Sequence, residues 1–127
     1  MKRYSKKGLE KRKSEREGLG EFFLKHVQNI RDNKLCCEEC GTKLIGDVSE
    51  VAHRLQKSIF KSIQRDDDNI IYLCSYKSIN NCHSLYDGSN DLLWSLSIFE
   101  DEKIKIKKLL SKVTEKYNYK ILDRWQI

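Results

Sequence analysis

Proline is absent from this 127-residue chain, and glycine occurs only six times. Flexible linkers rich in either residue are therefore not expected, and the length suits one domain. No stretch approaches the roughly 20 apolar residues of a membrane-spanning helix. The charged N-terminus also lacks the apolar run of a secretory signal. We therefore expect a single domain that stays in the cytoplasm and binds no membrane.

Five cysteines stand out in that composition. Disulfide frameworks are rare in a reducing cytoplasm, so metal binding explains them better. Cys37 and Cys40 form a Cys-x-x-Cys turn followed by glycine, a spacing that lets two thiolates reach one ion. Cys74 and Cys82 offer a second pair if the seven residues between them loop out. We expect these four to hold a structural zinc. Cys36, at a longer spacing from Cys40, is the weaker alternative and is expected to be a buried free thiol.

Positive charge is concentrated at the N-terminus. The chain carries a net charge of +6. The segment that ends at Glu17 has eight basic and three acidic residues, a net charge of +5. Such a block commonly binds phosphate backbones and releases their counterions, and the alternative is a solvated tail. The candidate DNA-binding residues are Lys6, Lys7, Lys11, Arg12, Lys13 and Arg16.

Hydrophobic periodicity predicts an α+β fold with short strands. Apolar residues at spacings of three and four predict a helix over 18–32, which the basic segment can extend. His26 lies on the apolar face of that helix, so we interpret it as a structural histidine. Alternation predicts a strand over 48–55. A β-branched and aromatic run predicts a buried strand over 69–74.

Helices are predicted for the last third of the chain. A short helix should run from Cys82 to Gly88, with the glycine in a left-handed conformation. A second short helix is predicted over 90–97 and a longer one over 98–117. The apolar stripe of the longer helix consists of Ile106, Leu109, Leu110, Val113 and Tyr117. Residues 119–125 are predicted to form either a terminal strand or an ordered tail.

Four stretches, taken in order, resemble the HNH endonuclease family and in particular its small phage members. They read Cys-x-x-Cys-Gly, Ala-His, Asn-Ile-Ile-Tyr-Leu-Cys and Cys-His-Ser-Leu-Tyr-Asp. The resemblance spans residues 37–87 and implies a ββα-metal motif held by a four-cysteine zinc. It implies one domain with three regions. These are a basic helical region (1–34), a core of zinc knuckle and ββα-metal motif (35–88) and a helical C-terminal region (89–127).

The resemblance assigns a role to each matched residue. It implies that His53 is the general base, since a neutral imidazole can take a proton from water near neutral pH. Asn69 would pin the loop between the strands and so orient His53. His83 would bind a catalytic Mg²⁺ or Mn²⁺. Asp87 lies one helical turn later on the same face and can join that ion. Cys82 points roughly 100° away, so one helix can serve both the zinc and the catalytic ion.

One position departs from the family pattern. Many members place Asp or His directly before the base, whereas this chain has Ala52, which cannot bind metal. The ion would then depend on His83, Asp87, water and DNA phosphate, which suits Mg²⁺ because it keeps several waters. Glu50, two residues earlier on the predicted strand, is a further candidate ligand. The departure leaves open a protein that binds DNA without cleaving it.

The sequence therefore predicts a metal-dependent endonuclease that acts on double-stranded DNA. A monomer would nick, because one active site cuts one strand at a time, and a dimer is the alternative. Two other functions fit parts of the sequence. The first is a zinc-stabilised nucleic-acid-binding protein without catalytic activity. The second is a zinc-stabilised protein-interaction domain, which the basic segment disfavours.

Overall fold

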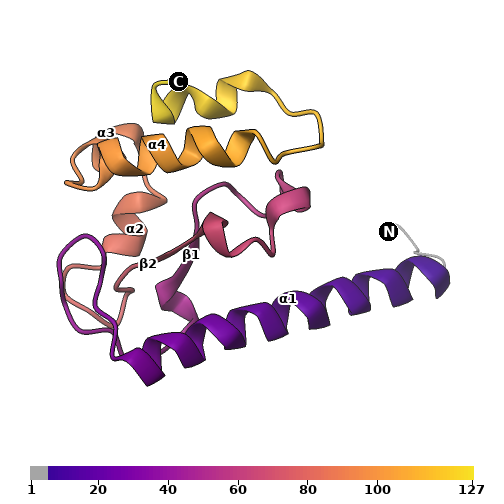
Figure 1. Ribbon diagram of the computed structural model, residues 1–127, viewed down its shortest axis with the longest axis horizontal. Coiled ribbons are helices and arrows are strands. Elements are labelled where there is room, and N and C mark those ends of the chain that lie inside the picture. Colours follow the sequence, from indigo (N-terminus) through magenta and orange to yellow (C-terminus); the bar gives the residue numbers. More distant parts are fainter. Residues whose placement is uncertain (1–5) are drawn as a thin grey trace.

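A long first helix and a small hairpin organise the fold (Figure 1). The computed structural model describes residues 6–127, with side chains from Gly18 onward. The helices and strands are α1 (Lys6–Asn33), β1 (Val51–His53), β2 (Ile70–Tyr72), α2 (Cys82–Tyr86), α3 (Asn90–Trp94) and α4 (Phe99–Leu110). Four 3₁₀ helices join them: Val48–Glu50, Lys61–Ile63, Asp67–Asn69 and Tyr119–Trp125. The chain is thus α+β, as predicted, with one two-stranded sheet among the described residues.

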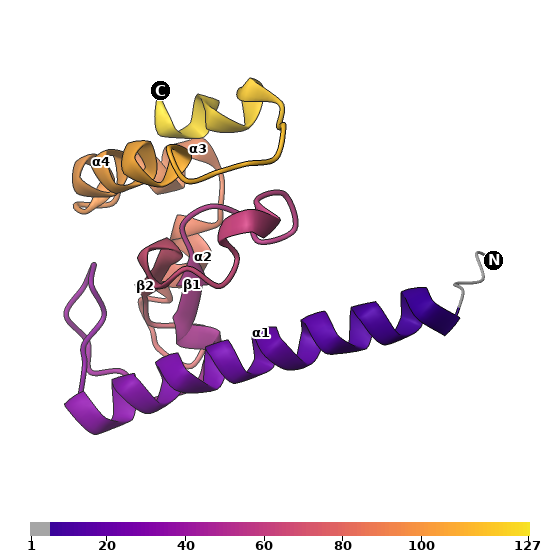
Figure 2. The same cartoon turned by 45° about the vertical axis from the view of Figure 1, so that its right-hand side comes forward.

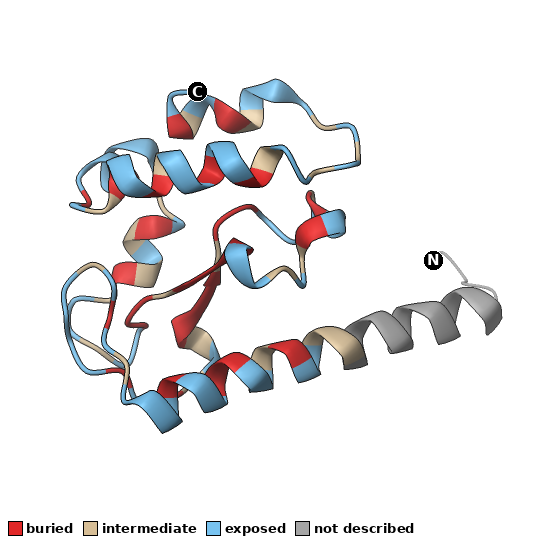
Figure 3. Ribbon diagram, in the orientation of Figure 1, coloured by how far each residue is buried: buried red, intermediate tan, exposed pale blue. Residues whose placement is uncertain are grey.

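The hairpin lies between two helical layers. Figures 1 and 2 show α1 along one side and α4 with the C-terminal 3₁₀ helix along the other, with β1, β2 and α2 between them. Figure 3 shows the buried residues on the inward faces of these elements. Within the described residues, no helix combines the length and apolar composition needed to cross a bilayer.

Helix α1 confirms the helix predicted over 18–32 and begins earlier, at Lys6. Its buried face carries Phe22, Val27 and Ile30. The helix ends where Lys34 takes a left-handed φ of 49° and the Leu35 amide donates to the Ile30 carbonyl (3.1 Å). This hydrogen bond and the left-handed residue close the last turn, as at many helix C-termini.

His26 joins α1 to the hairpin. The side chain is buried, and its Nε2–H donates to Asp67 Oδ1 (2.9 Å) while Nδ1 accepts from the Tyr72 hydroxyl. Burial lowers the pKa of His26 and outweighs the hydrogen bond and the charge of Asp67, which raise it. A neutral imidazole that makes two hydrogen bonds in this buried position has a structural role.

The strands are shorter than predicted. β1 and β2 pair antiparallel with His53 opposite Ile70. The strand predicted over 48–55 is wrong at its start because Val48–Glu50 is a 3₁₀ helix, held by a capping box between Asp47 and Glu50. Hydrogen bonds from these side chains to the nearby backbone replace the strand-to-strand hydrogen bonds that a longer strand would make.

A buried ion pair connects the hairpin to the C-terminal region. Arg54 follows β1, and its Nε donates to Glu102 Oε1 of α4 (2.8 Å). The hydroxyl of Tyr86 donates to the same oxygen (3.1 Å). Both charged side chains are buried, so removing one partner would leave an uncompensated charge in the core.

The C-terminal region departs from the sequence prediction in two places. α4 ends at Leu110 rather than near 117, and Tyr117 turns back to pack its ring on Phe60 (centroids 5.0 Å apart). Residues 119–125 form a 3₁₀ helix, which fits the predicted ordered tail and not the strand. Trp125 is buried there and stacks on Phe99 (5.8 Å).

Gly88 ends α2 for a reason other than the predicted left-handed conformation. Its φ is not positive, and the preceding Asp87 is right-handed. A Cβ at this position would meet Ser84 O at 2.9 Å and Leu92 Cδ1 at 2.8 Å. Close packing between α2 and α3 therefore requires glycine here.

Candidate functional site

Four cysteines converge beside the start of α2. The Sγ atoms of Cys37, Cys40, Cys74 and Cys82 all lie within 4.8 Å of one another. The Cys40 and Cys74 sulfurs are 3.7 Å apart. Tetrahedral zinc with Zn–S bonds of about 2.3 Å would separate its sulfurs by about 3.8 Å. The cluster has the donor set and spacing to hold a metal such as zinc, as the sequence predicted.

Local turns bring the two pairs together. Gly41 has a φ of +76°, and its amide donates to the Cys37 carbonyl (2.9 Å). This tight turn brings Cys37 and Cys40 close enough to bind one ion. The residues between Cys74 and Cys82 loop out, and the Cys82 amide donates to Cys74 Sγ (3.3 Å). This hydrogen bond keeps the sulfur of Cys74 beside the start of α2, where Cys82 lies.

The surroundings of the cysteines shift their pKa values in different directions. Burial raises the pKa of Cys40, but hydrogen bonds from Thr42 and Asn80 outweigh it and bring the pKa to about 6. Burial raises the pKa of the Cys37 and Cys82 thiols. Metal binding must therefore displace protons from the buried thiols, so metal affinity rises with pH.

Cys36 lies outside the cluster and is exposed, so the prediction of a buried thiol was wrong. It pairs with Lys43 in an isolated antiparallel bridge. Successive side chains of an extended segment point to opposite sides. Cys37 therefore turns inward to the cluster and Cys36 turns to solvent.

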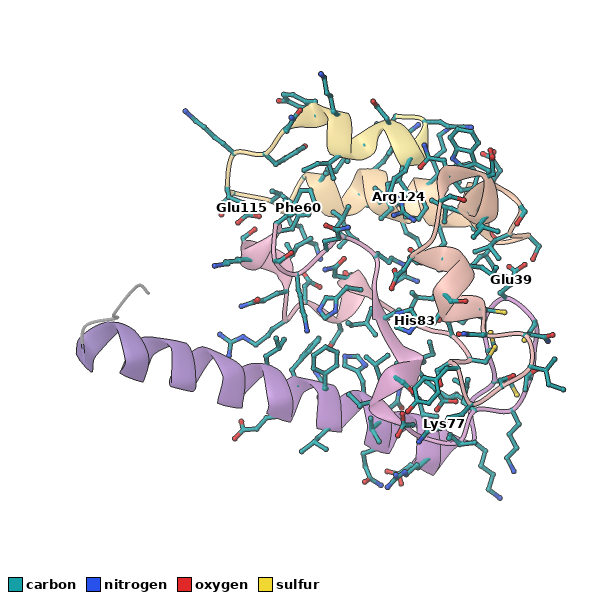
Figure 4. The ribbon with its side chains drawn as sticks, turned by 180° about the vertical axis from the view of Figure 1, so that it is seen from behind. Glu39, Phe60, Lys77, His83, Glu115 and Arg124 are labelled. Carbon is teal, nitrogen blue, oxygen red and sulfur yellow. The ribbon has the colours of Figure 1, made fainter. Side chains whose placement is uncertain are left out.

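A cavity of about 430 Å³ lies next to the cysteine cluster, on the other side of α2. His53 at the end of β1 lines it together with His83 and Asp87 from α2. Figure 4 shows the sulfur atoms gathered at the edge of the molecule and His83 closer to its middle. α2 thus presents Cys82 to one site and His83 to another, as the helical rotation predicted.

His53 is held as a neutral imidazole. Its Nε2 lies 2.8 Å from the Gln64 carbonyl, which can only accept, so Nε2 carries the proton and Nδ1 carries the lone pair. Burial lowers the pKa of His53, and it outweighs the Gln64 hydrogen bond, which raises it; the charge of Lys57 also lowers it. The arrangement leaves Nδ1 as a base at neutral pH.

His83 and Asp87 form a close pair that is stable only with a proton or a metal ion between the facing atoms. His83 Nδ1–H donates to the Ser49 carbonyl (2.6 Å), so the neutral ring presents a lone pair at Nε2. That Nε2 lies 2.9 Å from Asp87 Oδ2, where two acceptors would repel. A proton or a metal ion resolves the conflict. Accordingly, the hydrogen bond to Asp87 raises the pKa of His83.

The same pair fits a divalent ion. Two neighbouring ligands of an octahedral ion with bonds of about 2.1 Å lie about 3.0 Å apart. The observed 2.9 Å between His83 Nε2 and Asp87 Oδ2 matches this spacing. The side chain of Asp87 is 61% exposed, so solvent can supply the remaining ligands as water.

Asn69 organises the loop that follows β1. It is fully buried, and its Oδ1 accepts from the Leu55 amide (2.7 Å) while Nδ2 donates to the Leu55 carbonyl (3.1 Å). Its own carbonyl accepts from the Arg54 amide (2.8 Å). These bonds fix the backbone one and two residues after His53, which is the contact that the resemblance implies for this position.

Replacing Asn69 by alanine is expected to lower the free energy of unfolding by about 2–5 kcal/mol, because it leaves buried amide and carbonyl groups of Leu55 unpaired. Urea unfolding followed by circular dichroism measures the loss. Asn33→Ala is the control, since Asn33 is exposed at the end of α1 and should change stability by less than about 0.5 kcal/mol. Equal effects of the two substitutions would contradict this role.

Neither of two positions shortly before His53, the acidic Glu50 and the apolar Ala52, supplies a further metal ligand to the cavity. Ala52 lines the cavity but has no side-chain donor for a metal ion. Glu50 is buried elsewhere, and its carboxylate accepts from the amides of Ile45, Gly46 and Asp47. It does not line the cavity, so the sequence interpretation of Glu50 as a further ligand was wrong. Its 3₁₀ conformation, which replaces the predicted strand, turns it toward the preceding loop.

The predicted DNA-binding side chains lie outside the described ones. They are Lys6, Lys7, Lys11, Arg12, Lys13 and Arg16. The structure adds three cavity residues that sequence reasoning missed: Arg54, Lys57 and Arg124. The carbonyls of Gln64 and Ser49, which set the tautomers of the histidines, also have no sequence pattern, because every residue carries one.

Comparison with family models, curated proteins and solved structures finds no significant match to this chain. The functional argument therefore depends on the residues and geometry described above.

Proposed function

We propose that this chain is a metal-dependent DNA endonuclease of the HNH type that nicks double-stranded DNA. One observation carries the proposal: a neutral histidine, His53, and a histidine–carboxylate pair, His83 and Asp87, line the same cavity. They follow the order strand, strand, helix that the ββα-metal motif requires. The adjacent cysteine cluster supports the proposal, since the resemblance also implies a zinc there.

In the proposed reaction His53 is the general base. Its Nδ1 takes a proton from water while Nε2–H stays bonded to the Gln64 carbonyl, which holds the ring in place. The water oxygen bonds to phosphorus, and the bond from phosphorus to the leaving oxygen breaks. The Gln64 carbonyl also favours the imidazolium that results, since both ring nitrogens then carry protons.

His83 and Asp87 would hold the divalent ion at the same phosphate. When bound, such an ion supplies positive charge to the developing phosphorane and the leaving oxygen. The Ser49 carbonyl fixes His83 in the tautomer that directs Nε2 to the ion, which is the usual work of an outer hydrogen bond. Asn69 acts indirectly: its hydrogen bond fixes the backbone that follows His53.

The test is nicking of supercoiled plasmid by the purified full chain with Mg²⁺ or Mn²⁺. We expect conversion to open circles that depends on the added ion. The ion is omitted rather than chelated in the control reaction, because a chelator would also strip zinc from the cysteines. No nicking across several divalent ions would refute the nuclease function.

Asp87→Asn is expected to raise the Mg²⁺ concentration for half-maximal nicking by about tenfold or more, because the ion loses a charged ligand. Asp91→Asn is the matched control, since Asp91 is exposed on α3 outside the cavity. Titration of the nicking rate with Mg²⁺ measures both. If the two variants require the same Mg²⁺ concentration, Asp87 is not a ligand.

A zinc-stabilised nucleic-acid-binding protein without catalysis is the alternative function. The observation that favours it is the short ligand set, because Ala52 offers no donor and Glu50 is bonded to the preceding loop. This alternative predicts DNA binding that is independent of Mg²⁺ and no nicking. The same plasmid assay, run beside a binding measurement, separates the two functions.

A further inference from the structure

The cavity has more positive than negative charge. Arg54, Lys57 and Arg124 line it, and Asp87 is its one carboxylate among the described residues. Glu102 neutralises Arg54. Among the residues whose side chains are described, Lys57 and Arg124 have no carboxylate partner. A wall of this composition suits an anionic ligand.

Arg124 is placed by packing that fixes its backbone. It lies in the C-terminal 3₁₀ helix, where the indole Nε1–H of Trp94 donates to the Arg124 carbonyl (2.6 Å). The next residue, Trp125, is buried between Phe99 and Tyr86 (centroids 5.8 and 5.6 Å away). The helix therefore presents Arg124 rigidly, which lowers the entropy cost of binding a ligand.

The guanidinium of Arg124 lies at the end of α2 that carries the metal pair. Its Nη2 donates to the Tyr86 carbonyl, and Tyr86 directly precedes Asp87. Figure 4 shows Arg124 above His83. The contact orients one edge of the guanidinium and places it at the end of α2, in the wall of the cavity that His83 and Asp87 also line.

The charge of Arg124 has no carboxylate partner within the part of the chain that the structure describes, and its guanidinium lies over the ring of Trp125 (5.9 Å to the centroid). No carboxylate there lies within ion-pair distance of it, although its Nε is buried and makes no hydrogen bond. A partly buried, uncompensated guanidinium is costly unless a ligand brings negative charge. The planar fork of arginine matches the oxygens of a phosphate.

We propose that Arg124 is a phosphate-binding residue that holds a DNA phosphate in the cavity beside His83 and Asp87. This inference rests on the proposed function for the identity of the ligand as DNA. The C-terminal helix, outside the stretch that resembles the HNH family, thereby completes the wall of the site.

The first test measures DNA binding without cleavage. In a His53→Ala background, the affinity for a short duplex is measured by fluorescence anisotropy at several salt concentrations. Arg124→Met should weaken binding and reduce the slope of log K against log salt by about 0.9, the value for one phosphate contact. Lys120→Met is the matched control, because Lys120 is exposed on the same helix and does not line the cavity. An unchanged slope, or no DNA binding by the background protein, would overturn the proposal.

The second test measures nicking in the otherwise unaltered chain. Arg124→Met should lower the nicking rate roughly 100-fold, as loss of one charge-stabilising donor commonly does. Arg124→Lys keeps the charge but loses the planar fork of the guanidinium, so it should lower the nicking rate by only about tenfold. If the methionine variant fails to fold, the lysine variant decides, and a normal rate for it would overturn the proposal. If the unaltered chain does not nick, the proposed function fails and the binding test alone decides the role of Arg124.

Discussion

Replacing Cys40 by serine is expected to remove a bound zinc ion and unfold the chain. The purified protein should carry about one zinc per chain, because four sulfurs already lie at distances that suit tetrahedral coordination. Structural zinc contributes about 10–16 kcal/mol in small domains, which exceeds the total stability of most of them. Losing one of four thiolates should therefore abolish both metal binding and the cooperative fold.

Cys40 is the informative position because it is exposed. Serine there removes little buried surface, so destabilisation would report the metal and not the core. Cys36→Ser is the matched control, since Cys36 is also exposed, lies four residues earlier and does not belong to the cluster. It should keep its zinc and its stability.

Elemental analysis and urea unfolding measure the two properties together. A strong chelator should unfold the unaltered chain in the same way as Cys40→Ser does. A chain that folds without zinc and withstands the chelator would show that the four cysteines serve packing alone. Equal behaviour of the Cys36 and Cys40 variants would lead to the same conclusion.

His53→Ala is expected to reduce plasmid nicking by roughly 10²–10⁴-fold, which is the usual contribution of a general base. The substitution should leave DNA affinity within about twofold, because His53 carries no charge at neutral pH. It also opens space in the wall of the cavity, where free imidazole can enter and restore part of the rate. Rescue by imidazole would separate loss of the base from loss of the fold.

The pH dependence of nicking follows from the neutral state of His53. Burial lowers the pKa of His53 below 6.5, so the ring keeps its lone pair down to lower pH than an exposed histidine would. At saturating Mg²⁺ the rate should therefore stay level down to about pH 6.5 and fall only below it. Nicking by His53→Ala at the rate of the unaltered chain would exclude His53 as the base.

The proximity of the candidate metal-binding residues could be predicted from the sequence more directly for some of them than for others. Cys37 and Cys40 are three residues apart, so a local turn suffices to bring them together, and their spacing identifies them as a pair. Cys74 and Cys82 needed a second assumption, that the loop between them folds out, and the structure confirms the resulting cluster. The helical spacing of His83 and Asp87 likewise predicted a pair on one face, which the structure shows at 2.9 Å.

Two other positions could not be predicted, one because of a local capping arrangement and one because of a contact with a distant segment. Glu50 looked like a strand residue near the site, but three amides from residues 45–47 bind its carboxylate. Tyr117 continued a helical stripe, but its ring packs on Phe60, nearly sixty residues away in sequence. Tertiary contacts such as the one between Tyr117 and Phe60 override local propensity where the local preference is weak.

The sequence by itself determined the chemistry that this protein can hold: four thiols at metal spacing, two histidines and a carboxylate in order, and an α+β pattern with one long helix. Those features follow from periods of two and 3.6 residues and from turn geometry, which act over a few residues. Only the tertiary structure decided that His53 faces the cavity with Asp87, that backbone carbonyls set the histidine tautomers, and that Arg124 closes the wall from the other end of the chain. These contacts join segments far apart in sequence, and packing of the whole core, not local spacing, fixes them.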